Sequence, residues 1–289
     1  MNNHDKSISL IRTMYKQHGL LSLSNMYSKE TIDDWNHRLD PLFNERATQK
    51  RSYVKADELL ALGILEEVMS PKLMNTINLL DPCPIFFHCH CFEIEGNSSQ
   101  NHIGFDELDG WHRDHSDPNI KSVYGCRPSS VFIYLSDVPS TNYGSFEIIP
   151  DYDSGPLESD LDCCNITGDK GTTFLWNRDL YHRPNVNSSP VRRRILKLSI
   201  QTNGWANSRI HLDEFKNALS ALGDDNQALA YLLGSHFDNY QATLTMPHSQ
   251  TAELPQVTSI SSSTKTKIPN KAEVMLRRIR NKVDKALRL

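Results

Sequence analysis

Apolar residues in the first part of the chain recur with a helical period. The spacing predicts a helix that Gly19 ends, a short apolar strand over residues 20–23, and a second helix for which Ser28 is a suitable N-cap. A further helical stretch covers residues 59–80 and ends before Asp81-Pro82. The apolar positions of the first two helices are Ile8, Ile11, Met14, Tyr15, Ile32, Trp35, Leu39 and Phe43.

The pattern changes in the middle of the chain to short strand-like runs separated by turn residues. Many short strands without regular intervening helices favour a closed β structure, either a barrel or a jelly roll. The fold class that we predict is therefore mainly β with flanking α-helices. The predicted strands are residues 86–94, 129–138, 144–149, 172–176 and 193–201.

The last third returns to helical spacing and then changes composition. We predict a main domain over residues 1–205, a helical extension over 206–245, and a flexible Ser/Thr/Pro/Lys-rich linker over 246–270. Residues 271–289 form an apolar stripe flanked by Lys and Arg, which predicts a basic amphipathic helix. Such a helix fits peripheral binding to an anionic membrane or to an acidic groove of a protein partner. The alternative is that it folds back onto an acidic core or is a solvated end.

Composition excludes several classes of protein. The chain has 289 residues, 38% hydrophobic and 23% charged, so it is sufficiently apolar for a sizeable core. Its formal charge of −4 gives no basic field for nucleic acid, and no apolar run is long enough to cross a bilayer. The polar start is unlike a secretory signal, so we expect a cytoplasmic protein whose six cysteines are reduced.

The run His88-Cys89-His90-Cys91 has the composition of a metal site. In a strand, however, alternate side chains point to opposite faces, so the two histidines and the two cysteines separate. We therefore expect a strand that presents its histidines to a cavity, and we regard a zinc site formed by this run alone as geometrically unfavourable.

A His-x-Asp pair together with a distant His forms the three-ligand face that holds Fe(II) and leaves coordination positions open. The copy His112/Asp114 follows Trp111 at the entry to the strand-rich region, and His182 is the candidate third ligand after the strand 172–176. The adjacent pair remains an alternative, whereas the last two copies lie in helical sequence, where i and i+2 side chains diverge. The four copies are His112/Asp114, His115/Asp117, His211/Asp213 and His236/Asp238.

Three arginines, residues 192–194, open the last predicted strand. Alternation places Arg193 on the more polar face, with Lys197 and Ser199, and places Arg192 and Arg194 on the opposite, mostly apolar face. A buried arginine binds a carboxylate through a bidentate fork, so this strand is a candidate dicarboxylate anchor. The alternative is a solvated strand end.

These motifs together resemble the phytanoyl-CoA dioxygenase family of Fe(II)/2-oxoglutarate oxygenases, over about two-thirds of the chain, residues 15–201. The segments that carry the resemblance are YKQHGLLSLSNMYSKETIDDWNHRLDPLF, WHRDH, YLSDVPSTNYGSFEIIP and GDKGTTFLWNRDLYHRPNVNSSPVRRR. The resemblance implies a double-stranded β-helix core with N-terminal helices and a helical C-terminal extension. It also implies that His112, Asp114 and His182 bind Fe(II), and that Asn187 and Arg193 bind 2-oxoglutarate.

The implied activity is hydroxylation of a C–H bond of a small-molecule substrate by O₂, with release of succinate and CO₂. Two departures from the family pattern bear on the ligands: Pro184 replaces a hydroxyl residue, and Asp151-Tyr152-Asp153 replaces Gly-Ser-His, which suggests an unusual substrate. The competing hypotheses are a non-catalytic binding module on the same fold and, in third place, a zinc metallohydrolase using the same ligands.

Overall fold

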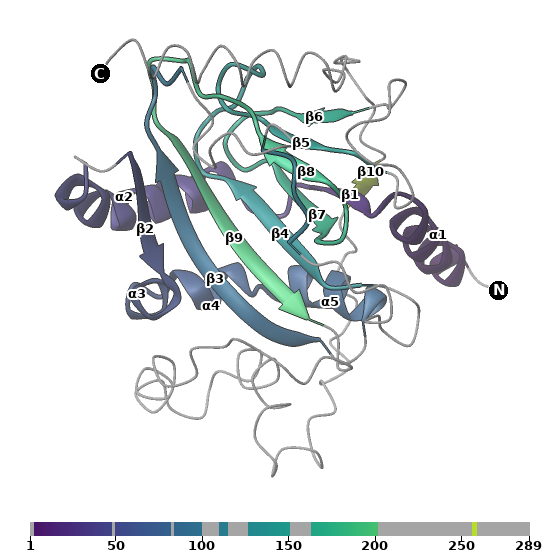
Figure 1. Cartoon of the computed structure of the whole chain (residues 1–289). Coiled ribbons are helices and arrows are strands. Elements are labelled where there is room, and N and C mark those ends of the chain that lie inside the picture. Colours follow the sequence, from purple (N-terminus) through teal and green to yellow (C-terminus); the bar gives the residue numbers. More distant parts are fainter. Residues whose placement is uncertain are drawn as a thin grey trace, which may run out of the picture.

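A computed structural model describes residues 3–47, 50–81, 84–99, 110–114, 127–150, 163–201 and 256–258. They form a seven-stranded sheet in the order β10-β1-β7-β4-β9-β3-β2 and a three-stranded sheet in the order β6-β5-β8 (Figure 1). All paired strands are antiparallel. The strands are β1 Leu20–Ser24, β2 Arg51–Lys55, β3 Ile85–Ile94, β4 Ser129–Tyr134, β5 Phe146–Ile148, β6 Cys164–Ile166, β7 Thr173–Asn177, β8 His182–Pro184, β9 Arg193–Gln201 and β10 Gln256–Thr258.

The N-terminal helices pack on one face of the large sheet (Figure 1). Their apolar side chains share a core with the outward residues of the sheet, including Leu196 and Leu198 of β9. The Ser28 side chain accepts a hydrogen bond from the Thr31 amide, so the predicted N-cap is confirmed. The helices are α1 Asn3–His18, α2 Lys29–Glu45, α3 Ala56–Ala61, α4 Ile64–Val68 and α5 Pro71–Leu80.

The opposite, inner face of the large sheet faces the small sheet. A second core cluster joins Phe132, Trp176 and Ile195 of the large sheet with Phe146 and Ile148 of β5. Two facing antiparallel sheets with helices on one outer face form a jelly-roll arrangement, as the sequence predicts. The inner face is where the candidate ligands lie.

The predicted helical stretch over residues 59–80 is instead three helices. Gly63 has a left-handed φ of 69°, which ends one helix and begins the next, and Ser70-Pro71 starts the third. Strands β2, β6 and β8, which have three to five residues each, are not among the predicted strands.

Several predicted features lie outside the described residues. They include the His115/Asp117 pair, the segment 151–153, the helical extension 206–245 and the basic helix 271–289. Three residues of the predicted linker, Gln256–Thr258, form β10 and pair with β1. The proposed division of the C-terminal part therefore stays a prediction.

In the described part of the chain, no helix has both the length and the apolar character needed to span a bilayer.

Candidate functional site

Three side chains from two distant segments of the sequence meet on the inner face. His112 forms an isolated antiparallel bridge with His182, and the two backbones exchange hydrogen bonds of 3.1 and 3.0 Å. Asp114 Oδ1 lies 3.7 Å from His112 Nε2 and 3.8 Å from His182 Nε2. Of the side chains that the structure describes, these form the one group of three His, Cys, Asp or Glu whose ligand atoms are close enough to share a metal ion, all within 4.8 Å.

Both imidazoles are oriented by the backbone. His112 Nδ1 lies 2.8 Å from the Gly110 carbonyl oxygen, and His182 Nδ1 lies 3.0 Å from the Leu180 carbonyl oxygen. Because a carbonyl only accepts, each Nδ1 carries the proton and each Nε2 keeps its lone pair. Two neutral Nε2 atoms and one carboxylate oxygen therefore converge, which fits a metal ion with open coordination positions.

The second oxygen of Asp114 faces two cations. Lys197 Nζ donates to Asp114 Oδ2 at 2.7 Å, and Arg178 Nε lies 3.6 Å from the same oxygen. Burial raises the pKa of Asp114, but the positive charges of Lys197 and Arg178 outweigh burial and hold that pKa well below its usual range. The carboxylate is thus ionised and presents a single oxygen to the two histidines.

Arg193 lies on the inner face of β9 with no hydrogen-bond or ion-pair partner among the described residues. Its side chain is buried, and Nε and Nη1 make no hydrogen bond. Burial lowers its pKa to about 10, so it remains charged at neutral pH. A buried guanidinium without hydrogen-bond acceptors destabilises the fold, and a carboxylate ligand would accept hydrogen bonds from it.

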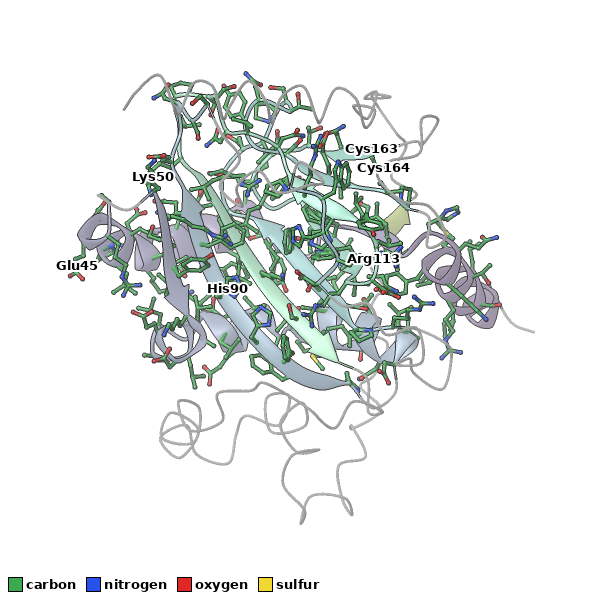
Figure 2. The ribbon with its side chains drawn as sticks, viewed as in Figure 1. Glu45, Lys50, His90, Arg113, Cys163 and Cys164 are labelled. Atoms are coloured by element: carbon green, nitrogen blue, oxygen red, sulfur yellow. The ribbon has the colours of Figure 1, made fainter. Side chains whose placement is uncertain are left out.

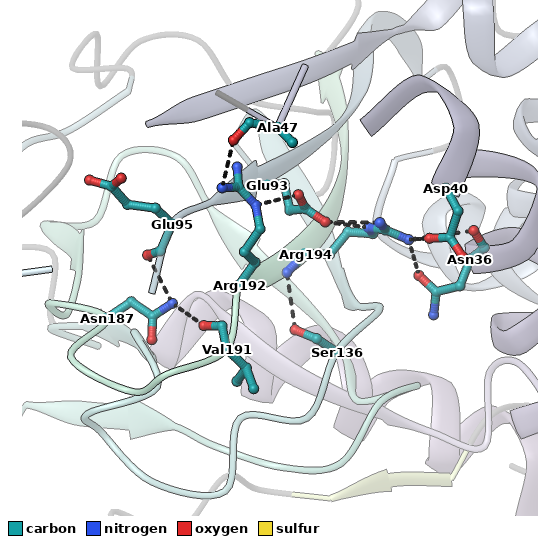
Figure 3. Close-up of polar contacts among 10 residues, drawn as sticks. All are labelled: Asn36, Asp40, Ala47, Glu93, Glu95, Ser136, Asn187, Val191, Arg192 and Arg194. Atoms are coloured by element: carbon teal, nitrogen blue, oxygen red, sulfur yellow. Dashed lines mark hydrogen bonds and ion pairs between the residues drawn. The ribbon is translucent and has the colours of Figure 1, made fainter. Parts of the chain in front are cut away.

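The two neighbouring arginines are paired on the opposite face of the strand (Figure 3). Glu93 accepts from Arg192 Nε at 2.6 Å and from Arg194 Nη2 at 2.8 Å, and Arg194 Nη1 donates to Asp40 Oδ1 at 2.9 Å. Their charges therefore stabilise the packing of β9 on β3 and α2. The alternation predicted from the sequence separates Arg193 from them.

Asn187 lies in the turn that leads into β9 (Figure 3). Its amide nitrogen donates to the carbonyl oxygens of Glu95 and Val191 at 3.1 and 2.9 Å, and its oxygen accepts from Ser189 Oγ at 2.7 Å. These bonds fix the turn beside Arg193. A direct contact of Asn187 with a cofactor stays a prediction.

The histidines and cysteines of β3 separate as expected. Cys89 and Cys91 are buried in the core shared with the helices, whereas His88 and His90 stack at 4.9 Å between ring centroids on the inner side. Figure 2 labels His90 on this strand. Burial lowers the pKa of both histidines, that of His90 to about 3, so both are neutral.

Two further cations of the inner face were not predicted as site residues. Arg178 follows β7, and Arg51 lies on β2 with its guanidinium 5.0 Å from the Phe92 ring centroid. Neither stands in a recognisable motif, so only the alternation and pairing of the strands reveals them. Lys197 was placed on the correct face, but its contact with Asp114 depends on a loop that spacing does not locate.

Comparison with known proteins gives no matching family model and no matching curated protein. Solved structures do match. AviO1 from Streptomyces viridochromogenes has a TM-score of 0.54 and 11% identity over 69% of this chain and 97% of that one. The α-ketoglutarate-dependent carbocyclase SnoK has a TM-score of 0.52 and 12% identity over 67% of this chain and 84% of that one.

A third similar structure is the epimerase SnoN in complex with Fe³⁺, α-ketoglutarate and nogalamycin RO. Its TM-score is 0.52 at 12% identity, over 72% of this chain and 89% of that one. At such identities the likeness shows the fold. The predicted mainly β, jelly-roll fold class is therefore confirmed.

Proposed function

We propose that this chain is an Fe(II)- and 2-oxoglutarate-dependent dioxygenase that hydroxylates a C–H bond of a small molecule. The observation that carries the proposal is the convergence of His112, Asp114 and His182 on the same sheet face as a buried, unpaired Arg193. The fold supports it, since it is shared with proteins described as α-ketoglutarate-dependent, one of them solved with iron and α-ketoglutarate. The motif resemblance to the phytanoyl-CoA dioxygenases supports the same chemistry.

In this proposal His112 Nε2, His182 Nε2 and Asp114 Oδ1 bind the Fe(II). Two imidazoles and one carboxylate would hold the ion and would leave coordination positions free for the co-substrate and O₂. The bound metal and 2-oxoglutarate supply the oxidising chemistry, with succinate and CO₂ as products. The chain orients the ligands through the carbonyls of Gly110 and Leu180 and holds Asp114 ionised through Lys197.

Arg193 binds the far carboxylate of 2-oxoglutarate. It lies on the same face of β9 as Lys197, the partner of Asp114, four residues or roughly 13 Å earlier along the strand. Apolar side chains of the inner core, among them Phe132 and Ile195, would shield the co-substrate from water.

The carboxylate ligand favours hydroxylation over halogenation. As a ligand, Asp114 would take the coordination position that a chloride ion would otherwise need. Chlorinated product formed by the wild-type chain would contradict this part of the proposal.

The ligand assignment is tested by anaerobic Fe(II) titration of the purified chain and two aspartate variants, followed by addition of 2-oxoglutarate. Asp114→Ala should lose most Fe(II) affinity and the visible charge-transfer absorbance of the Fe(II)–2-oxoglutarate chelate. Asp117→Ala is the matched control and should keep both. If Asp117→Ala loses iron while Asp114→Ala retains it, the adjacent His-x-Asp pair is the true ligand.

A further inference from the structure

The inner face carries more positive charge than the co-substrate can neutralise. Four cationic side chains belong to it, and Asp114 is the one carboxylate among the described residues with which any of them makes an ion pair. The four are Arg51, Arg178, Arg193 and Lys197.

Formal charges show what remains after loading. The two charges of Fe(II) equal those of Asp114 and the keto-acid carboxylate of 2-oxoglutarate, and the far carboxylate pairs with Arg193. Three cations remain. Arg51, which has no ion pair with a described residue, lies at the Arg193 end of the face. Lys197 and Arg178 share one carboxylate that already binds the metal. Uncompensated charge in a buried site is costly, so an additional anion would stabilise the loaded centre.

Arg178 is better placed than Lys197 to bind that additional anion. It is 5% exposed, and its Nε and Nη1 make no hydrogen bond within the described part of the chain. Its Nε lies 3.6 Å from Asp114 Oδ2, beyond hydrogen-bond range, whereas Lys197 Nζ is bonded to that oxygen at 2.7 Å. Asp179, the next residue, is paired with Arg127 and does not compete.

The position of Arg178 separates it from the co-substrate anchor. The register of β9 places Arg193 opposite Ile94 at one end of the face and Ser199 opposite His88 at the other. Arg178 lies at the Ser199 end, because it directly follows β7 and its amide donates to the Pro128 carbonyl next to β4. Metal ligands thus lie between two arginines that have free hydrogen-bond donors.

The surroundings of Arg178 fit an organic anion. Its guanidinium lies 4.6 Å from the Phe87 ring centroid, and Phe87 stands against His88 at 4.8 Å between ring centroids. His88 Nδ1 is buried without a partner among the described residues. A guanidinium group binds an oxyanion through two parallel hydrogen bonds, and an adjacent aromatic ring can pack against the carbon skeleton of the same ligand.

We propose that Arg178 binds the anionic group, a carboxylate or phosphate, of the primary substrate, and that it holds the substrate's C–H bond near the metal. This inference rests on the proposed dioxygenase function. It names the substrate class as small organic anions.

The test uses the full chain loaded anaerobically with Fe(II) and saturating 2-oxoglutarate. The probes are two pairs that differ in charge, benzoate against benzamide and phenyl phosphate against phenol, with affinity read from the change in the charge-transfer absorbance. The acid of at least one pair should bind about tenfold or more tightly than its neutral partner, as expected of a charge-assisted hydrogen bond. The pair that shows the preference distinguishes a carboxylate from a phosphate substrate.

Three variants locate the anion. Arg178→Gln should bring the ratio of acid to neutral affinity close to one, and Arg178→Lys should retain part of it, because lysine keeps the charge without the fork. Arg51→Gln removes an arginine of the same face at the opposite end and should leave the ratio unchanged. Equal binding of acids and neutral partners by the wild type, or loss of the ratio in Arg51→Gln alone, would overturn the proposal.

Failure of the two proposals is distinguishable. A chain that shows no absorbance band with Fe(II) and 2-oxoglutarate contradicts the dioxygenase function itself. A chain that forms the band but does not prefer anions contradicts only the assignment of Arg178.

Discussion

At the scale of single residues, strand alternation gives three consecutive arginines different environments. Arg192 and Arg194 share Glu93 on the outer face, whereas Arg193 is buried on the inner face without an ion-pair partner among the described residues. Because an unpaired buried charge destabilises a fold, its presence is best explained by a ligand that completes it. The function of this position therefore depends on geometry as well as charge.

Arg193→Lys keeps the charge and loses the bidentate fork. We expect the concentration of 2-oxoglutarate needed for half-maximal turnover to rise by about tenfold or more, the loss expected for a charge-assisted hydrogen bond. Arg192→Lys is the control and should change that concentration little, because its partner Glu93 lies on the other face. Steady-state succinate release at varied 2-oxoglutarate measures both. A larger effect in Arg192→Lys than in Arg193→Lys would show that Arg192, on the outer face, binds the 2-oxoglutarate carboxylate.

The sequence predicted the residues that occur in motifs and missed those defined only by neighbours. The motif, its context and the family resemblance predict His112, Asp114 and His182 as ligands, with His115/Asp117 as the alternative, and the structure brings the three together. Arg178 was missed because its environment arises from the pairing of β7 with β4 and of β4 with β9, none of which is visible in local sequence.

At the scale of elements, the turns shape the site as much as the strands do. Gly144, in the turn before β5, has a φ of 74°, and a Cβ there would lie 3.2 Å from Asn187 Cβ and 3.4 Å from Arg193 Nη1. The absence of a side chain thus lets the turn approach Arg193. Gly63, between α3 and α4, has a similar φ of 69° but meets only Arg38 Nη1, at 3.5 Å.

These two glycines make a matched pair of variants. Gly144→Ala and Gly63→Ala should each destabilise the fold by about 1 kcal/mol, because left-handed backbone strains any residue with a Cβ. Only Gly144→Ala should also weaken 2-oxoglutarate binding, since its methyl group crowds Arg193. Urea unfolding and 2-oxoglutarate titration separate the two effects. Equal weakening of binding in both variants would show that strain, and not proximity, is responsible.

At the scale of the whole molecule, burial of neutral histidines makes stability depend on pH. Burial lowers the pKa of His88, His90 and His182, the last two to about 3. The contribution of these histidines to the free energy of unfolding is complete above the unfolded histidine pKa of about 6.5 and is lost as the pH falls toward 3. The reason is that, within this window, the unfolded chain takes up the protons and the folded chain does not. The metal-free protein should therefore become acid-labile in that window.

Urea unfolding of the metal-free chain between pH 7 and pH 4 measures this dependence. The free energy of unfolding should fall by about 1.4 kcal/mol per pH unit for each histidine, once the pH is well below 6.5. His90→Gln should reduce the slope, and His37→Gln, which removes an exposed histidine of α2, should not. A slope that is the same in His90→Gln and the parent chain would contradict the burial of a neutral His90.

The central claim is that this chain turns over 2-oxoglutarate at the metal site formed by His112, Asp114 and His182. The most direct measurement is release of labelled CO₂ from 1-¹⁴C-labelled 2-oxoglutarate by the purified full-length chain with Fe(II), O₂ and a panel of small organic acids, phosphates and neutral metabolites. We predict release that requires Fe(II) and is lost in His182→Ala. No release above the protein-free control with any compound, or equal release by His182→Ala, would contradict the account.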